Sequence, residues 1–101
     1  MSKTSDNLMR YFIEFVGTFL FVSVILVTGN PIAIGVALAA VVFWGGKISG
    51  GAFNPAVALG LYARNNIDTQ QFFIYVTVQL LAAVCAYYYW KYVSEDAKVR
   101  V

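Results

Sequence analysis

The sequence predicts an all-α integral membrane protein, with three transmembrane helices and one re-entrant half-helix in a single domain over residues 1–101. Of these residues, 60% are hydrophobic and 12% are charged, which is too apolar for a soluble domain and typical of a membrane protein. Apolar runs at about residues 8–28, 32–46 and 70–93 indicate the three spans. A polar, glycine-rich segment followed by a short apolar run, at about residues 47–64, indicates the re-entrant element.

The charged and sulfur-containing residues exclude several classes of function. The net charge is +2 and the basic residues are spread along the chain, so we expect no nucleic-acid partner. There is one cysteine, Cys85, and no histidine, which excludes a disulfide framework and a histidine-based metal site. No nucleophile–base pair or metal-ligand cluster is present, so we expect neither enzymatic activity nor a cofactor. Cys85 lies among apolar residues, where we expect it to pack.

The first span carries one acid, Glu14. An ionisable group inside a span is costly and usually faces the protein interior or a water-filled cavity. Two interpretations are open. Glu14 lies at the wet interface, where it pairs with Arg10 four residues earlier, or it is buried and accepts hydrogen bonds from other parts of the chain. A tight turn at residues 29–31 then leads into the second span, which we expect Gly45 and Gly46 to end.

The segment at residues 47–64 contains an Asn-Pro pair that marks the start of a helix. Asn54 is a favoured N-cap, and Pro55 at the first helical position loses only an N–H that has no helical partner. About ten helical residues follow, roughly 15 Å, which is half of a 30 Å hydrocarbon core. We therefore expect a half-helix that begins near mid-membrane. The alternative is a surface turn between two spans.

The third span follows Asp68 or Thr69, either of which can cap it, and it contains Gln79. A glutamine inside a span is most simply explained by a hydrogen bond between helices. Aromatic residues cluster at the far end of the span and indicate an interfacial belt rather than a base-stacking surface, because few basic residues surround them. They are Tyr87, Tyr88, Tyr89, Trp90 and Tyr92.

Residues 49–60, SGGAFNPAVALG, resemble the first NPA loop of the aquaporin and aquaglyceroporin family, the major intrinsic proteins. The family pattern SGGHFNPAVTLG agrees at ten of the twelve positions, with Ala52 and Ala58 as the departures. Residues 14–18 also resemble the ExxxT motif of the family's first span. The resemblance covers about residues 10–93 and one half of the family's fold, so it implies a half-length member.

The resemblance implies a role for each matching residue. Asn54, Pro55 and Ala56 would form the NPA centre of a pore, while Glu14 and Gln79 would support the loop. Backbone carbonyl groups before the half-helix would form a ladder of acceptors for the solute. These belong to Gly50, Gly51, Ala52 and Phe53.

The position that matches the family's pore-narrowing arginine is Val57. Its partners in the selectivity constriction would fall near Ile34, Val42 and Gly51. All four are apolar or lack a side chain, which implies a wider or drier constriction than that of a strict water channel. Glycerol facilitators carry an aspartate where this chain has Ala58, so the sequence matches neither standard subtype.

The sequence contains a single NPA motif, and one half of this fold cannot enclose a pore. The half-helix would also leave backbone N–H groups unpaired at mid-membrane. We therefore expect an antiparallel homodimer, with the resemblance implying four such dimers, or eight chains. Basic residues divide equally between the two ends, which permits both orientations, while Lys47 favours an inside N-terminus slightly. The two sets are Lys3, Arg10 and Arg64 against Lys91, Lys98 and Arg100.

The expected function is passive passage of water or small neutral solutes through a channel in the lipid of a cell membrane. Two alternatives from other classes remain open from the sequence. One is a small dual-topology exporter that couples transport to protons through Glu14. The other is a non-conducting partner of a full-length channel.

Overall fold

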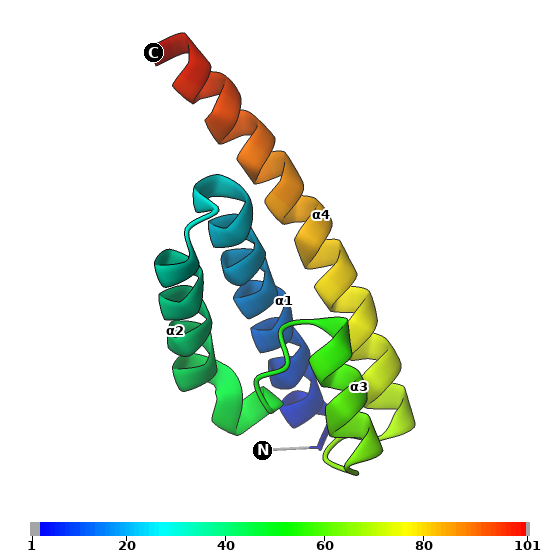
Figure 1. Cartoon of the computed structure of the whole chain (residues 1–101). Coiled ribbons are helices and arrows are strands. Elements are labelled where there is room, and N and C mark those ends of the chain that lie inside the picture. The colour runs from blue at the N-terminus through cyan, green and yellow to red at the C-terminus, as the bar shows by residue number, and fades with distance from the viewer. Residues whose placement is uncertain (1–2, 101) are drawn as a thin grey trace.

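The structure, a computed structural model, describes the backbone of residues 3–100 and the side chains of residues 5–94. It consists of helices α1 (Lys3–Thr28), α2 (Pro31–Ser49), α3 (Pro55–Ala63) and α4 (Thr69–Arg100), and this part of the chain contains no strand (Figure 1). Three of them contain apolar segments long enough to span a membrane: Ser5–Thr28, Pro31–Ser49 and Thr69–Ser94. The predicted fold class is therefore confirmed, although α1 begins before residue 8 and α4 continues beyond residue 93.

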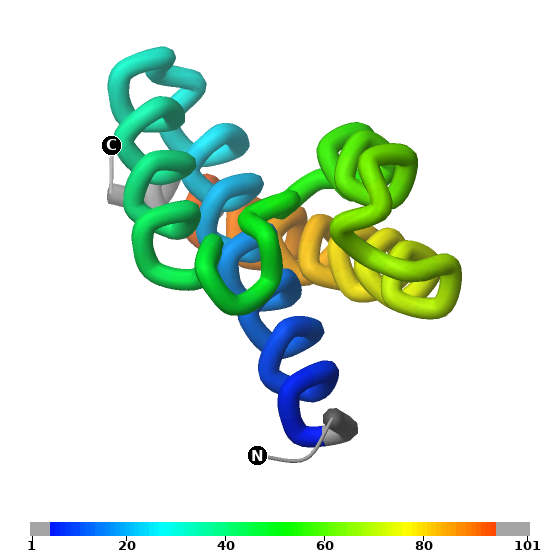
Figure 2. The backbone as a smooth tube through the Cα atoms, turned by 90° about the horizontal axis from the view of Figure 1, so that it is seen from below, coloured from blue at the N-terminus to red at the C-terminus, as the bar shows by residue number. Residues whose placement is uncertain are grey.

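The helix α1 lies at the centre of the arrangement. It packs against α2 on one side and α4 on the other, while α3 packs against α4. Seen from the end, α2 and α3 lie on either side of α1, and the loop between them passes across it (Figure 2). The nine residues of α3 extend about 14 Å at 1.5 Å per residue. This short helix begins about half-way along α1 and returns to the end where α1 starts (Figure 1).

The second helix does not end at Gly45 and Gly46, so that prediction was wrong. Gly45 is buried and close to Ile13 of α1, because a Cβ atom on Gly45 would lie 2.2 Å from the Ile13 Cγ2 atom. Gly45 therefore lets α1 and α2 approach rather than ending α2. The helix ends at Gly50, which has a left-handed φ of 93° and donates its N–H to the Gly46 carbonyl.

The three later helices begin with side-chain caps. The Asn30 side-chain oxygen Oδ1 accepts from the N–H groups of Ile32 and Ala33 at the start of α2. Asn54 accepts from the Val57 N–H at the start of α3, as predicted. Asp68 rather than Thr69 caps α4. Its carboxylate accepts a hydrogen bond from the Gln71 N–H, and the Gln71 side-chain oxygen accepts one from the Asp68 N–H. This reciprocal pair is a capping box.

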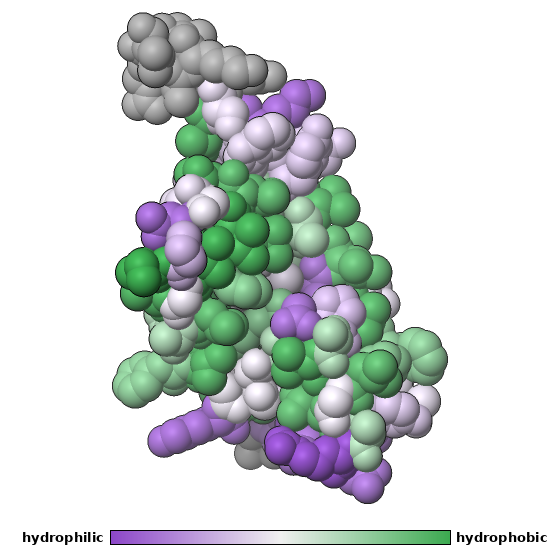
Figure 3. Space-filling model, viewed as in Figure 1, coloured by the Kyte–Doolittle hydropathy of each residue, from purple (hydrophilic) through white to green (hydrophobic). Residues whose placement is uncertain are grey.

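Much of the outer surface of a single chain is apolar. Figure 3 shows hydrophobic residues over most of one face, with hydrophilic residues at the end where α3 finishes. Phe43 of α2 is 91% exposed and Ile32 is 74% exposed, as expected for side chains that face lipid or a partner subunit. Cys85 also lies on the exposed surface of α4, so the prediction that it packs in the core was wrong.

Candidate functional site

The loop between α2 and α3 has an irregular backbone that lies inside the protein. Gly50 and Gly51 both have positive φ angles, 93° and 69°, which glycine adopts at little cost. Phe53 also has a positive φ, 58°, which is unfavourable for a bulky residue unless its surroundings hold it. Its ring is fully buried against Gly17 of α1, where a Cβ atom would lie 2.1 Å from the ring.

Glu14 is the centre of the hydrogen bonds that hold this loop. Its side chain is fully buried, and each carboxylate oxygen accepts two hydrogen bonds. The Oε1 atom accepts from the Phe53 N–H at 2.8 Å and from Gln79 Nε2 at 2.9 Å. The Oε2 atom accepts from Ser49 Oγ at 2.7 Å and from the Ala52 N–H at 3.2 Å. The interpretation of Glu14 as a wet interfacial acid was therefore wrong.

Two further residues of this network were not predicted from the sequence. The Ser49 hydroxyl bonds Glu14 and also accepts the Gly51 N–H at 3.1 Å, and Ser49 is fully buried. The Tyr75 hydroxyl donates to the Ser49 carbonyl oxygen. Tyr75 lies four residues before Gln79, so both project from one face of α4 toward the loop. That spacing was the available signal for Tyr75.

The backbone N–H groups of the loop at residues 50–53 are paired within the protein, whereas its carbonyl oxygens are not. Each of the N–H groups of residues 50–53 donates to the protein: to the Gly46 carbonyl, to Ser49 or to Glu14. Within the described residues, no hydrogen bond reaches the carbonyl oxygens of residues 50–53. Gly50 is exposed and Gly51 is half-buried, whereas Ala52 and Phe53 are buried in a single chain.

Three donor groups at the start of α3 have no partner among the described residues. The Asn54 side-chain oxygen accepts from the Val57 N–H at 2.9 Å, and the Asn54 backbone carbonyl accepts from the Ala58 N–H at 3.0 Å. Pro55 has no N–H. The N–H groups of Asn54 and Ala56 and the Asn54 Nδ2 group remain. Figure 3 shows a hydrophilic spot in the middle of the apolar face, at the height where α3 begins.

Two of the four candidate constriction residues lie together. A Cβ atom on Gly51 would lie 3.6 Å from both methyl groups of Val42. Val42 also lines a hollow of about 370 Å³ with Phe43, Lys47 and Gly50. Ile34 is eight residues earlier on α2, about 12 Å away along the helix axis, and is not part of this pair. Val57 is 42% exposed on the first turn of α3.

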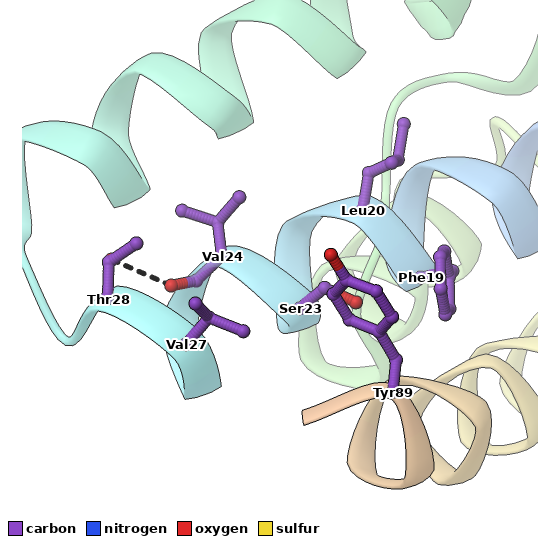
Figure 4. Close-up of a pocket in the computed structure, with 7 residues that line it drawn as sticks. All are labelled: Phe19, Leu20, Ser23, Val24, Val27, Thr28 and Tyr89. Atoms are coloured by element: carbon purple, nitrogen blue, oxygen red, sulfur yellow. Dashed lines mark hydrogen bonds between the residues drawn. The ribbon is translucent and has the colours of Figure 1, made fainter. Parts of the chain in front are cut away.

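A second hollow, of about 340 Å³, lies between α1 and α4 at the end of the molecule opposite α3 (Figure 4). Its walls are largely apolar and include Phe19 and Tyr89, whose rings meet edge to face with centroids 6.0 Å apart. Ser23 also lines it, and the buried Ser23 hydroxyl has no hydrogen-bond partner among the described residues. A buried hydroxyl without a partner is unfavourable.

Known proteins resemble the chain as follows. The family model described as Major intrinsic protein matches residues 1–100. The chain is 34% identical over 86 residues to glycerol uptake facilitator protein-like 6 of Lactiplantibacillus plantarum, covering 76% of this chain and 40% of that protein. It is 32% identical over 89 residues to probable aquaporin PIP1-5 of Arabidopsis thaliana, covering 71% of this chain and 31% of that protein.

A third relative is aquaporin NIP3-1 of Zea mays, 34% identical over 87 residues, with 72% of this chain and 29% of that protein covered. No solved structure matches the chain. The chain thus spans 40% or less of the length of these three relatives. The match over residues 1–100 and the helices that can span a membrane confirm the predicted resemblance. The chain belongs to the major intrinsic protein family and is an integral membrane protein.

Proposed function

We propose that two copies of the chain, inserted in opposite orientations, form a passive channel for water and small neutral solutes. The loop at residues 50–53 is the observation that carries this proposal. Its N–H groups bond the protein interior while its carbonyl oxygens have no internal partner. Gly50 and Gly51 are accessible in a single chain, so their carbonyl oxygens can replace hydrogen bonds that a neutral solute loses when it leaves water.

Asn54, Pro55 and Ala56 form the centre of the proposed pore. The Asn54 oxygen is engaged by its own helix, which orients the amide so that Nδ2 remains for the solute. The N-terminus of α3 also carries a partial positive charge, about half an elementary charge. Two such termini meeting at mid-membrane would disfavour protons and other cations. This arrangement suits an uncharged solute that both accepts and donates hydrogen bonds.

The second copy supplies a re-entrant helix for the half of the structure in which a single chain has none. The helix α3 occupies only the half of the structure near the start of α1 (Figure 1). The groove beside Ser23 lies in the other half, where the chain has no re-entrant element. We assign the apolar surface of an inverted partner to this groove. The relatives' greater length supports the pairing, because a second half would supply the same surfaces within one chain.

Conduction by the chain alone tests the proposal. Purified protein is reconstituted into liposomes of a simple phospholipid mixture, and osmotic volume changes are followed by stopped-flow light scattering. We expect faster water flux than in empty liposomes, and flux of glycerol or urea that does not depend on a pH gradient. Rates equal to those of empty liposomes for all three solutes would reject the channel.

The variant Asn54→Ser gives a matched control for conduction. Serine keeps the N-cap acceptor, so α3 should still form. It removes the amide donor, so solute flux should fall while the protein remains folded. Transport that required a pH gradient would instead support the proton-coupled exporter. The full burial of Glu14 under four donors argues against that alternative, because the carboxylate is not exposed to a water-filled path.

Selectivity should respond to the side chain at Val57. Arginine there adds bulk and hydrogen-bond donors to a constriction that otherwise holds apolar residues, so Val57→Arg should lower glycerol flux more than water flux. A barrier higher by about 1.4 kcal/mol for glycerol alone changes the ratio about tenfold. Both fluxes are measured in the same liposomes. Val57→Met adds length without charge as the control, and an unchanged ratio in the arginine variant would show that Val57 lies outside the constriction.

A further inference from the structure

A pocket of about 210 Å³ lies at the end of the molecule where α2 and α3 finish. Three cationic side chains line it, Arg10 from α1, Lys47 from α2 and Arg64 after α3. No acidic residue lines it, and none of the three forms a salt bridge with the side chains that the structure describes. Like charges so close together are unfavourable without a compensating negative charge.

Part of this charge is compensated within the fold. Lys47 lies in the last turn of α2 and Arg64 is the C-cap residue of α3, and each helix C-terminus carries about −0.5 charge. Asp6 shares a neighbouring hollow with Arg10. Asp68 does not line the pocket, and it lies at the positive N-terminus of α4, which it caps. Two helix termini and Asp6 together offset about two of the three positive charges, so a net charge of about +1 remains.

We propose that this basic pocket, defined by Arg10, Lys47 and Arg64, binds a phosphate-type oxyanion. The Arg64 Nε–H group donates to the Asn66 side-chain oxygen, which orients the guanidinium and leaves its two NH₂ groups for the two oxygens of a phosphate. The volume is below the roughly 300–1,000 Å³ of pockets for larger small molecules. A single phosphate group therefore fits better than an extended ligand.

The location of the basic pocket permits two sources of the phosphate group, a lipid headgroup or soluble phosphate. The pocket lies at the ends of membrane-spanning helices, where lipid phosphate groups reside, and it is also open to soluble phosphate. Ser49 and Gly50 form one of its walls, and Ser49 bonds Glu14. The bound oxyanion would thus border the loop that carries the proposed pore, although its binding does not depend on conduction.

Thermal unfolding of the delipidated protein in an uncharged detergent tests the site. One series adds inorganic phosphate, with chloride at equal ionic strength as reference. A second series adds phosphatidic acid, with diacylglycerol as reference. We expect a saturable rise of the midpoint with at least one phosphate probe. Loss of one charge-assisted contact should weaken the apparent affinity about tenfold in Lys47→Gln, and the loss should be larger in the double variant Lys47→Gln with Arg64→Gln.

The variant Lys91→Gln removes a basic residue at the opposite end of α4 and should bind as the unmodified chain does. A rise with inorganic phosphate identifies a soluble ligand, and a rise with phosphatidic acid alone identifies a lipid headgroup. Lys47 is exposed, so the single variant keeps the test valid if the double variant does not fold. No rise with either probe, or an equal rise in the Lys47 variant, would overturn the site.

Discussion

Replacing Glu14 with alanine should lower the free energy of unfolding by about 2–6 kcal/mol. Four donors converge on this buried carboxylate. The Ser49 hydroxyl can still turn to the Gly45 carbonyl, 3.4 Å away, and the Gln79 side chain can rotate, but the backbone N–H groups of Ala52 and Phe53 are fixed and have no other acceptor among the described residues. Each buried donor left unpaired costs about 1–3 kcal/mol. The loss is measured by denaturant unfolding in mixed micelles, followed by circular dichroism and tryptophan fluorescence.

Three variants separate this effect from general damage to the core. Thr18→Val lies one turn further along α1, and the Thr18 hydroxyl is buried without a partner, so its removal should cost little or even stabilise. Gln79→Ala removes one of the four donors and should cost less than Glu14→Ala. Glu14→Gln keeps the volume but brings an NH₂ group against donors, so it should also destabilise. Equal stability of the Thr18 and Glu14 variants would show that the carboxylate does not hold the loop.

The sequence predicted the fold and the start of the half-helix because both depend on local chemistry. Asn30-Pro31 and Asn54-Pro55 use the same cap, since each asparagine accepts N–H groups of the helix that follows. The first pair begins a helix of 19 residues and the second a helix of 9 residues. The cap alone therefore predicts where a helix begins, but not its depth in the membrane. The length of the apolar run after each Asn-Pro pair distinguished the full span from the half-helix.

The missed features depend on tertiary contacts. Gly45 and Gly46 suggested a helix end because glycine has low helix propensity, yet α2 continues through both, and Gly45 is buried against Ile13 of α1. Ser49 supports the loop through a bond to Glu14, 35 residues away in sequence, and Tyr75 through a bond to Ser49, 26 residues away. Motif matching named Glu14 and Gln79, but the paired donors on each carboxylate oxygen required the structure.

We expect the chain to insert into the membrane in both orientations, in about equal amounts. Arg10, Lys47 and Arg64 share one pocket, so they lie at one end of the molecule. With Lys3, that end carries four basic residues, while the other end of α4 carries Lys91, Lys98 and Arg100. Four against three is too small a bias to fix one orientation. A homodimeric inverted pair requires this balance, because both orientations must come from the same gene product.

Labelling of single cysteines in intact cells tests this pairing most directly. One cysteine replaces Ser2 and another, in a separate protein, replaces Ala97, which follows the third candidate span, each in a Cys85→Ser background. A thiol reagent that does not cross membranes is applied from outside, and total labelling after lysis gives the reference. The inverted pair predicts that about half of the chains are labelled in each protein, as expected when charge bias is small. Full labelling at one position with none at the other would show a single orientation and contradict a channel built from two inverted copies.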